Sequence, residues 1–213
     1  NINLVSGGAR TLIASDLDGS APVLATSEVK AFNLAADVPY GLRILLPGES
    51  RTVSRPRSST TGRTVAAFNT QAGPSFAFSV VVDINDSYWN LTPGASQEIR
   101  LTSDDPFAVI VPTTQVITTS ATYTVYMKRA GDSRLFADMV SPTLQQPWAY
   151  SLVKDTSSVI NVAAGIPTKL VLKLPGQDFS EGSQTGKTFS AASQKAGDAL
   201  SAAGSGIIPD VRV

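Results

Sequence analysis

The oxygen-donating side chains at residues 83–86 are the part of this sequence whose types and spacing best fit ion binding. Asp83, Asn85 and Asp86 end an apolar segment and are expected in a loop. Calcium takes about six to eight oxygen ligands from flexible loops. The spacing therefore indicates a candidate calcium site, and no other cofactor is predicted. The alternative is Asx-turn hydrogen bonding to nearby backbone amides, because no glycine or twelfth-position glutamate completes a known calcium loop.

The prominent aromatic residues are the second set that can bind a partner. Tyr88 and Trp89 follow the acidic loop, and Trp148 and Tyr150 lie between expected strands, near a repeat boundary. If exposed, they can stack on sugars or anchor a protein partner. If buried, they fill the core or a junction between domains. We expect junction packing, above all at Trp148 and Tyr150.

Most enzyme mechanisms lack the residues that they need. The chain has no His and no Cys, which removes the commonest general base, the thiolate nucleophile and most zinc sites. Asp104 and Asp105 are adjacent, so on a strand they point to opposite faces and cannot flank one glycosidic bond. Gly182 and Gly186-Lys187 resemble a phosphate loop, but with three intervening residues instead of four. We therefore predict a protein that is not an enzyme.

The charge balance also limits the partners. Lys and Arg total 17 and Asp and Glu total 17, so the formal net charge is zero, and charged residues are only 16% of the chain. A neutral chain has no electrostatic footprint for nucleic acid. No apolar run approaches the roughly 20 residues of a membrane span. The partners that we expect are therefore neither nucleic acid nor the membrane interior.

Apolar residues recur at alternate positions, which is the period of a β-strand. The alternating sets are Phe76, Phe78, Val80, Val82 and Ile84; Ile99 and Leu101; Tyr123, Val125 and Met127; and Leu135, Ala137 and Met139. Pro-Gly, Ala-Gly and Asp-Asp-Pro sequences separate these segments. Short strands with regular turn signals predict an all-β sandwich.

The sequence contains an internal repeat. Residues 38–49 match residues 166–177, 128 residues further along, and both copies place alternating apolar residues before Leu-Pro-Gly. After a loop that is four residues shorter in the second copy, residues 61–64 match residues 185–188. Residues 188–203 approach helical spacing, but their counterpart contains Gly73-Pro74, so a loop or strand is expected there. Residues 204–213 match no other segment.

The end of the repeat unit also recurs. Residues 8–16 resemble residues 131–138, and residues 27–36 resemble residues 157–164. The expected organisation is therefore residues 1–36 as closing strands of one repeat, residues 37–165 as a complete repeat, and residues 166–213 as opening strands of the next. The chain begins at Asn1 without Met, as expected of a mature product or a fragment.

Four segments together carry a family resemblance. They are the opening strand at residues 42–49, the strand-ending turn at residues 82–91, the Leu-Thr-Ser-Asp-Asp-Pro corner at residues 101–106, and residues 122–138. In order and spacing they resemble the immunoglobulin-like tandem repeats of large bacterial secreted and surface proteins, of the filamin and invasin type. The resemblance implies a seven-stranded Greek-key sandwich without catalysis, used as a spacer, stalk or assembly module.

These observations predict a structural module of an extracellular or cell-surface protein. Its partners are expected to be neighbouring immunoglobulin-like repeats, or identical subunits of an extracellular filament whose ends complete each other by strand addition. The alternative is an adhesin-type module that binds a glycan or protein through its aromatic loops.

Overall fold

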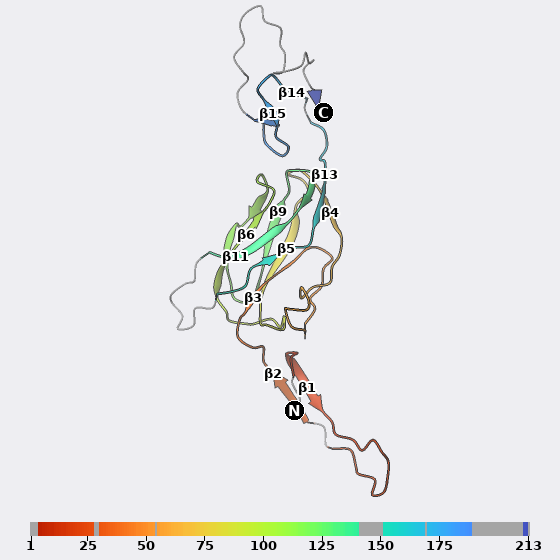
Figure 1. Cartoon of the computed structure of the whole chain (residues 1–213). Helices are drawn as coiled ribbons and strands as arrows, with labels where there is room; N and C mark the ends of the chain where they lie inside the picture. The colour runs from red at the N-terminus through yellow and green to blue at the C-terminus, as the bar shows by residue number, and fades with distance from the viewer. Residues whose placement is uncertain are drawn as a thin grey trace, which may run out of the picture.

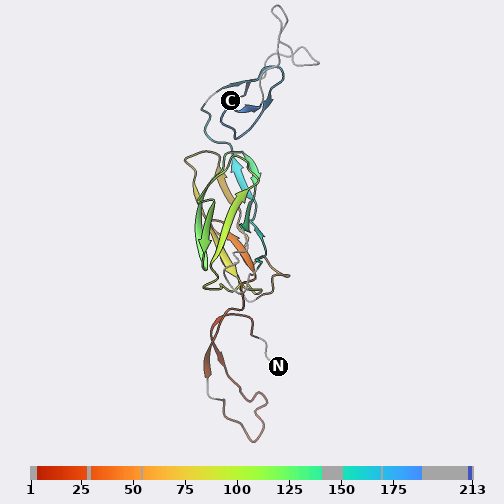
Figure 2. The ribbon, with the colours of Figure 1, turned by 90° about the vertical axis from the view of Figure 1, so that its left-hand side faces the viewer.

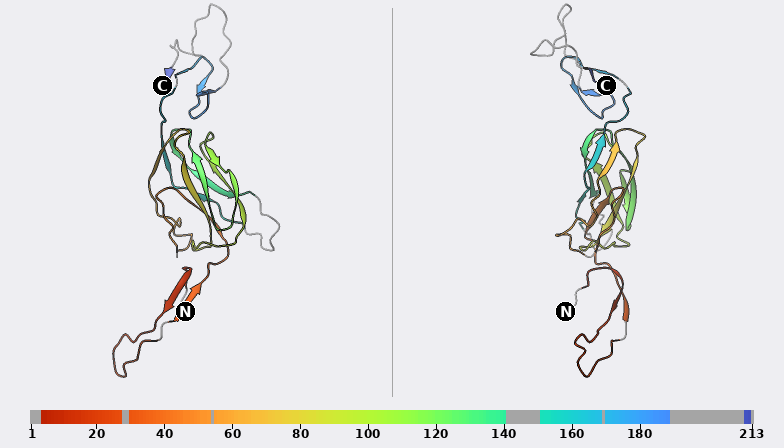
Figure 3. Two further views of the ribbon diagram at one scale, coloured as in Figure 1. Left: turned by 180° about the vertical axis from the view of Figure 1, so that it is seen from behind. Right: turned by 90° about the vertical axis from the view of Figure 1, so that its right-hand side faces the viewer.

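The computed structural model describes residues 4–27, 30–53, 55–140, 151–168, 170–188 and 211–212, and all regular structure in these residues is β-strand. This confirms the predicted all-β class. The molecule is elongated, with a two-layer body at its centre, a hairpin at the N-terminal end and a small lobe at the C-terminal end (Figure 1). The views turned by 90° and 180° show the same succession (Figures 2 and 3).

Two layers of strands form the central body. The first layer is an antiparallel sheet in the order β3 (Gly41–Leu45), β5 (Phe78–Asn85), β9 (Ser120–Tyr126), β7 (Val109–Val111). The second layer contains an antiparallel sheet in the order β12 (Asp155–Thr156), β11 (Leu135–Met139), β6 (Gln97–Ser103), β8 (Thr114–Ile117). It continues in the sheet β10 (Gly131–Ser133), β13 (Ile160–Ala163), β4 (Phe68–Gln71), in which β4 and β13 are parallel.

The two sheets of the second layer join where two chain segments bend together. Arg134 alone separates β10 from β11, and residues 157–159 separate β12 from β13. At this bend the Ser157 N–H donates to the Leu135 carbonyl at 2.9 Å, and the Leu135 N–H donates to Ser157 Oγ at 2.9 Å. The second layer is thus continuous, and the body is a β-sandwich.

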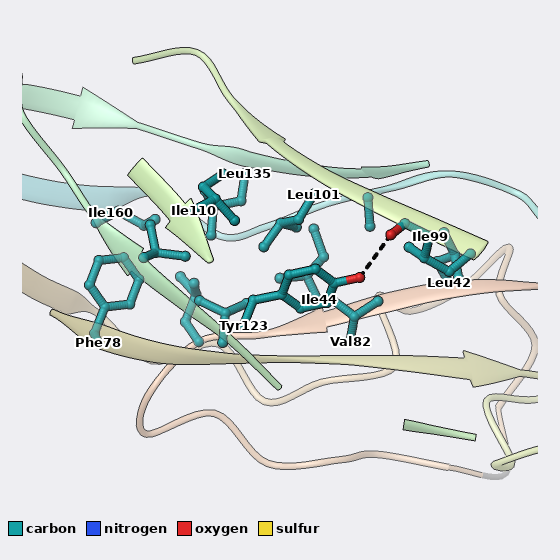
Figure 4. Close-up of a cluster of buried hydrophobic side chains, with 14 of the residues drawn as sticks. Leu42, Ile44, Phe78, Val82, Ile99, Leu101, Ile110, Tyr123, Leu135 and Ile160 are labelled. Carbon is teal, nitrogen blue, oxygen red and sulfur yellow. Dashed lines mark hydrogen bonds between the residues drawn. The ribbon is translucent and has the colours of Figure 1, made fainter. Parts of the chain in front are cut away.

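The core lies between the two layers (Figure 4). The alternating positions of β5, β6, β9 and β11 point inward as predicted, because successive side chains of a strand face opposite sides. The core residues that are no more than 1% exposed include Leu42, Ile44, Val80, Val82, Ile84, Ile99, Leu101, Tyr123, Val125, Met127, Leu135 and Ala137. Tyr123 also links the layers, since its hydroxyl donates to the Ile99 carbonyl at 3.0 Å.

The N-terminal hairpin repeats a strand pairing of the body. β1 (Gly8–Leu12) and β2 (Lys30–Leu34) are antiparallel and place Gly8 opposite Leu34, while β10 and β13 place Gly131 opposite Val162. The pairs that follow are Ala9 with Asn33 and Arg10 with Phe32 in the hairpin, and Asp132 with Asn161 and Ser133 with Ile160 in the body. Gly8 and Gly131 both have a positive φ, 103° and 112°. The register and the turn geometry are therefore the same.

The C-terminal lobe repeats the opening of the body. β15 (Asp178–Phe179) pairs with β16 (Lys187–Thr188) and places Phe179 opposite Lys187, as an isolated bridge places Arg51 opposite Arg63. Next to this pair the Ser180 N–H donates to the Gly186 carbonyl, and the Thr52 N–H donates to the Gly62 carbonyl, both at 2.9 Å. The two hairpins differ in loop length but not in how they close.

The strand that precedes this hairpin also keeps its partner. β14 (Val171–Leu172) pairs with β17 (Val211–Arg212), with Val171 opposite Arg212 and Leu172 opposite Val211. In the body, Arg43 is opposite Asp83 and Ile44 is opposite Val82. β17 therefore takes the place of β5, although residues 204–213 showed no match in sequence.

The Pro-Gly turns have one geometry in both copies. The Leu46 N–H donates to Glu49 Oε2 at 2.8 Å, and the Leu174 N–H donates to Gln177 Oε1 at 3.1 Å. Gly48 and Gly176 have φ angles of 86° and 84°, which glycine adopts without the steric cost of a Cβ. A side chain that accepts this amide bond, three residues after Leu, is thus part of the repeated motif.

Burial differs between the copies. Ile44 is 0% exposed in the body, whereas its counterpart Leu172 is 49% exposed in the lobe. The reason is that the described part of the lobe holds counterparts of β3 and β5 but no second layer to cover them.

We expect Tyr123→Phe to lower the free energy of unfolding by about 1–2 kcal/mol, because the Ile99 carbonyl loses a buried donor. Urea denaturation measures the change. Tyr126→Phe, on the same strand but partly exposed, is the control and should stay near wild type. Equal stability of wild type and Tyr123→Phe would show that the hydroxyl bond does not hold the layers together.

Candidate functional site

A buried ion cluster lies on the outer face of the first layer. Arg43 on β3 and Asp83 on β5 are direct cross-strand partners, and both are 0% exposed. Arg43 Nη2 and Nε donate to Asp83 Oδ2 at 2.7 and 3.1 Å. Arg51 binds the same carboxylate through two bonds of 2.9 Å, and Ser120 Oγ donates to it at 2.7 Å. The Asp83 carboxylate on β5 therefore binds two guanidinium groups, that of Arg43 on β3 and that of Arg51 in the segment after β3.

The electrostatics of Asp83 follow from these contacts. Burial alone would raise the pKa of Asp83, but the hydrogen bonds from Arg51, Arg43 and Ser120 outweigh burial and hold the pKa below its ordinary value. The carboxylate is thus ionised in the folded protein at neutral pH.

The ion cluster ties down the long segment between β3 and β4. Arg43 Nη1 donates to the Gly62 carbonyl at 2.9 Å and to the Thr52 and Trp89 carbonyls at 3.3 Å. Arg63, in the same segment, donates to the Ile44 carbonyl at 2.6 Å and forms an ion pair with Asp155. Arginine carries five donors in a planar fork, so two arginines fasten this irregular segment over the sheet.

Trp89 closes the cluster from outside the sheet and is buried, at 3% exposed. The Arg57 guanidinium carbon lies 3.7 Å from the centre of its ring, a cation–π contact. A Cβ at Gly62 would lie 2.1 Å from Trp89 Cδ2, so only glycine fits beneath the ring. Burial lowers the pKa of Arg57 to about 10. Trp89 thus packs against this chain and presents no open ring face to a sugar.

The three side chains predicted to bind calcium do not share one site in this structure. Asp83 faces the arginines, while the Asn85 side chain donates to the Trp89 carbonyl at 3.2 Å. Asp86 Oδ1 accepts the Tyr88 and Asn90 amides at 2.8 and 2.9 Å, which is Asx-turn bonding. No group of three or more carboxylate, His or Cys side chains in the described ranges could hold a metal ion. Calcium binding at Asp83, Asn85 and Asp86 stays a prediction.

The loop that carries Tyr88 and Trp89 meets the N-terminal hairpin through Asn90. Asn90 Oδ1 accepts the Gly7 amide at 3.0 Å, and its Nδ2 donates to the Val5 carbonyl at 2.9 Å. Asp86 Oδ2 accepts the Asp37 amide at 3.1 Å and the Asn90 side chain at 2.8 Å. The sequence left Tyr88 and Trp89 as either exposed partner contacts or buried packing residues, and the hydrogen bonds at this junction are made by their polar neighbours Asp86 and Asn90.

The opposite end of the body meets the C-terminal lobe in a similar way. A Cβ on Gly182 would lie 3.0 Å from the Arg129 amide nitrogen and 3.0 Å from the Phe107 ring. Residues 128–131 occupy, by strand register, the place that residues 5–8 occupy in the hairpin. Each junction thus uses the turn that precedes the same strand. Trp148 and Tyr150, the favoured junction residues, lie outside the described residues.

A groove of about 1090 Å³ lies beside β4 and the start of β5, and its lining includes Phe68, Phe76, Phe78 and Glu49. Its carboxylate, Glu49, accepts the Leu46 amide and the Ser158 hydroxyl. No helix among the described residues is long and apolar enough to cross a membrane.

Comparison with known proteins finds similar solved structures but no matching family. No family model matches the sequence, and no curated protein matches it. A crystal structure of the S-layer protein SbsC, domains 4 and 5, is 12% identical with a TM-score of 0.35, and covers 64% of this chain and 59% of that one. A structure of the surface layer protein SbsC, domains 1–6, is 14% identical with a TM-score of 0.36, and covers 70% of this chain. This chain spans only 17% of that second protein.

We expect Asp83→Asn to lower the free energy of unfolding at pH 7 by about 3–5 kcal/mol, since it leaves the buried Arg43 guanidinium without an anion and also removes the ion pair with the more exposed Arg51. The depressed pKa of Asp83 means that its contribution is full above the ordinary value of 3.8 and is lost as pH falls further. Stability should therefore fall less steeply below pH 3.8 in the variant. Urea denaturation at several pH values measures both effects. Asp132→Asn, at an exposed position, is the control; parallel pH profiles for Asp83→Asn and wild type would contradict the assignment.

We expect Asn90→Ala to release the N-terminal hairpin from the body without unfolding either, because it removes both bonds to residues 5–7. Hydrogen exchange should speed up by about tenfold or more at the Gly7 amide and stay unchanged in β5 and β9. Asn69→Ala, which removes an exposed side-chain bond to Asn161 at the other end of the body, is the matched control. Unchanged exchange at Gly7 would show that Asn90 does not hold the junction.

Proposed function

We propose that this chain is a section of a tandem array of immunoglobulin-like β-sandwiches in a secreted or surface-displayed protein, where it serves as a non-catalytic structural element. The observation that carries the proposal is that strand pairings of the body recur at both ends in the same register. In this assignment, residues 1–36 are the closing strands of one unit, residues 37–165 are a complete unit, and residues 166–213 open the next.

The strand order supports the immunoglobulin-like, Greek-key assignment. The chain passes from β5 in the first layer to β6 in the second, to β7 in the first and to β8 beside β6 in the second. It then returns to the first layer as β9, between β5 and β7, and crosses again to β10 and β11. The last strand, β13, lies parallel to β4, next to the beginning of the unit. A last strand that returns beside the opening strands is a feature of Greek-key sandwiches.

The shape supports an end-to-end array. The hairpin and the lobe lie at opposite ends of the body, and the body strands run roughly along the line that joins them (Figures 1 and 3). Since units stacked this way contact only their neighbours, the array can lengthen without changing any unit. Rods of this kind set distances, as a stalk or a spacer does.

The strands described at the two ends of the body fit a tandem array. The C-terminal lobe holds counterparts of β3 and β5, and the N-terminal hairpin holds counterparts of β10 and β13. Neither contains a described counterpart of β6–β9. The described strands of the hairpin and of the lobe thus correspond to the closing and opening parts of units, which is the order that a tandem array requires.

The acidic side chains support a structural role, because they hold turns and strands. Asp105 Oδ2 accepts the Lys128 and Arg129 amides at 2.7 and 2.9 Å. Asp104 Oδ1 accepts the Ser133 hydroxyl at 2.8 Å and the Arg134 amide at 2.9 Å. The adjacent carboxylates thus fasten separate neighbours across one corner of the sandwich, an arrangement that fits scaffolding and not a shared catalytic task.

Immunogold labelling of intact source cells with antibodies against residues 37–140 tests the proposed location. We expect label on the cell surface or on material extending from it, as beaded rods if units follow one another. Antibody preabsorbed with the purified chain is the control. Label that appears only after permeabilisation would contradict the proposal.

A glycan array with Tyr88→Ala and Trp148→Ala variants tests the adhesin alternative, and glycan binding abolished by either variant would favour that alternative instead.

A further inference from the structure

The strand pairs that open the two units share a backbone register but carry different side chains at one cross-strand position. In the body, Arg43 faces Asp83 across β3 and β5. At the same place in the lobe, Val171 faces Arg212 across β14 and β17. The hairpin position that holds Arg51 in the body holds Phe179 in the lobe.

The surrounding apolar pattern does not distinguish the two units. Leu42, Ile44 and Leu46 of the body correspond to Leu170, Leu172 and Leu174 of the lobe, and the same Pro-Gly turn follows in each. β-strand register is set mainly by the hydrophobic pattern. The opening strand of either unit therefore fits the partner strand of the other as far as hydrophobic burial is concerned. Exchange of such elements is a known failure of multidomain and repeat proteins.

We propose that the cluster of the buried Arg43 and Asp83 with the more exposed Arg51 is a strand-pairing code that makes β3 and β5 recognise each other and reject the corresponding strands of the next unit. This inference rests on the proposed repeat assignment. In this proposal, β5 pairs only with the opening strand of a repeat of this protein that carries arginine at the position of Arg43.

The first mismatch places β14 on β5. Val171 would then lie opposite Asp83, and the carboxylate would lose both bonds from Arg43, at 2.7 and 3.1 Å. Phe179 would stand where Arg51 supplies two more bonds. Asp83 would keep only Ser120 as a side-chain donor at a position that is 0% exposed. A buried carboxylate without a cation is strongly unfavourable.

The second mismatch places β3 on β17. Arg43 would then lie directly opposite Arg212, and like charges at directly opposed positions destabilise a strand pair. Arg43 would also arrive without the anion that compensates its burial. The first mismatch leaves the buried Asp83 carboxylate without arginine and the second opposes two arginines. The correct pairing of β3 with β5 instead gives Arg43 its carboxylate, and that of β14 with β17 sets Arg212 opposite valine. Penalties against the wrong partner are how specificity is obtained between strands of like shape.

The absence of Cys in the sequence allows a disulfide test of strand choice in the full chain. Leu45 lies opposite Val81 on β5, and Lys173 is the counterpart of Leu45 on the opening strand of the lobe. With Leu45→Cys, Val81→Cys and Lys173→Cys together, position 81 can bond to position 45 or to position 173. Refolding at high concentration under oxidising conditions, followed by mass spectrometry, measures the ratio of the two disulfides within and between chains.

In the otherwise wild-type background we expect the 45–81 disulfide almost alone. Exchanging the two residues, as Arg43→Val with Val171→Arg, should raise the share of the 81–173 disulfide by about tenfold or more, with a dimer in size-exclusion chromatography. The matched control is Ile44→Leu with Leu172→Ile, which exchanges the neighbouring apolar residues and should leave the ratio unchanged. A control ratio that shifts as much as that of the charge exchange would overturn the proposal.

The single variant Val171→Arg leaves the Arg43–Asp83 pair of the body in place, so it provides the test if the double variant does not fold. It should itself give a clearly higher 81–173 share than wild type, and an unchanged share would overturn the code. A separate protein with Leu172→Cys and Val211→Cys tests the repeat assignment. If that disulfide does not form, the repeat assignment fails; if it forms while the charge variants have no effect, only the code fails.

Discussion

The structure depends on one constraint, which is that the carboxylate of Asp83 cannot be buried without cations. It lies on a central strand at 0% exposure, where an unpaired charge would cost several kcal/mol. Arg43 forms an ion pair with it across the sheet, and Arg51 forms a second ion pair with it from the segment after β3. That segment must therefore fold back over the outer face of the first layer. A sheet face without a buried charge would not need such a cover.

The position of the junction follows from this folded-back segment. Arg43 also binds the Trp89 carbonyl, Trp89 packs over Gly62, and its loop places Asn90 against residues 5–7. Trp89 adopts a φ of 65°, which is unusual for a bulky residue and is held by contacts on both sides. A charge pair inside one sheet is in this way connected to the contact between the body and the hairpin before it. Trp89 thus positions the loop, and its polar neighbour Asn90 makes the hydrogen bonds of the junction.

The sequence predicted the strands and the core because both depend on local periodicity. Alternation identified the inward positions of β5, β6, β9 and β11, and the matching of short segments identified the repeat. The ion cluster could not be predicted in this way, since Arg43, Asp83 and Arg51 become neighbours only through pairing and loop return. Nor could β17 be found, because Val211 and Arg212 share register with β5 but not residue type. The sequence favours burial of the aromatic residues, but it does not show that the burial of Trp89 depends on a glycine 27 positions before it, Gly62.

The two units show that backbone pairing and side-chain chemistry vary independently in this chain. The turn at Leu-Pro-Gly, the hairpin closure and the strand register are kept, because each is set by backbone hydrogen bonds and glycine conformation. The charged positions differ, because the register leaves them free to do so as long as each unit is consistent within itself. An array of identical units would face strands that pair equally well with several partners. Under the proposed code, the difference between Arg43 opposite Asp83 and Val171 opposite Arg212 removes that degeneracy while the strand register stays the same.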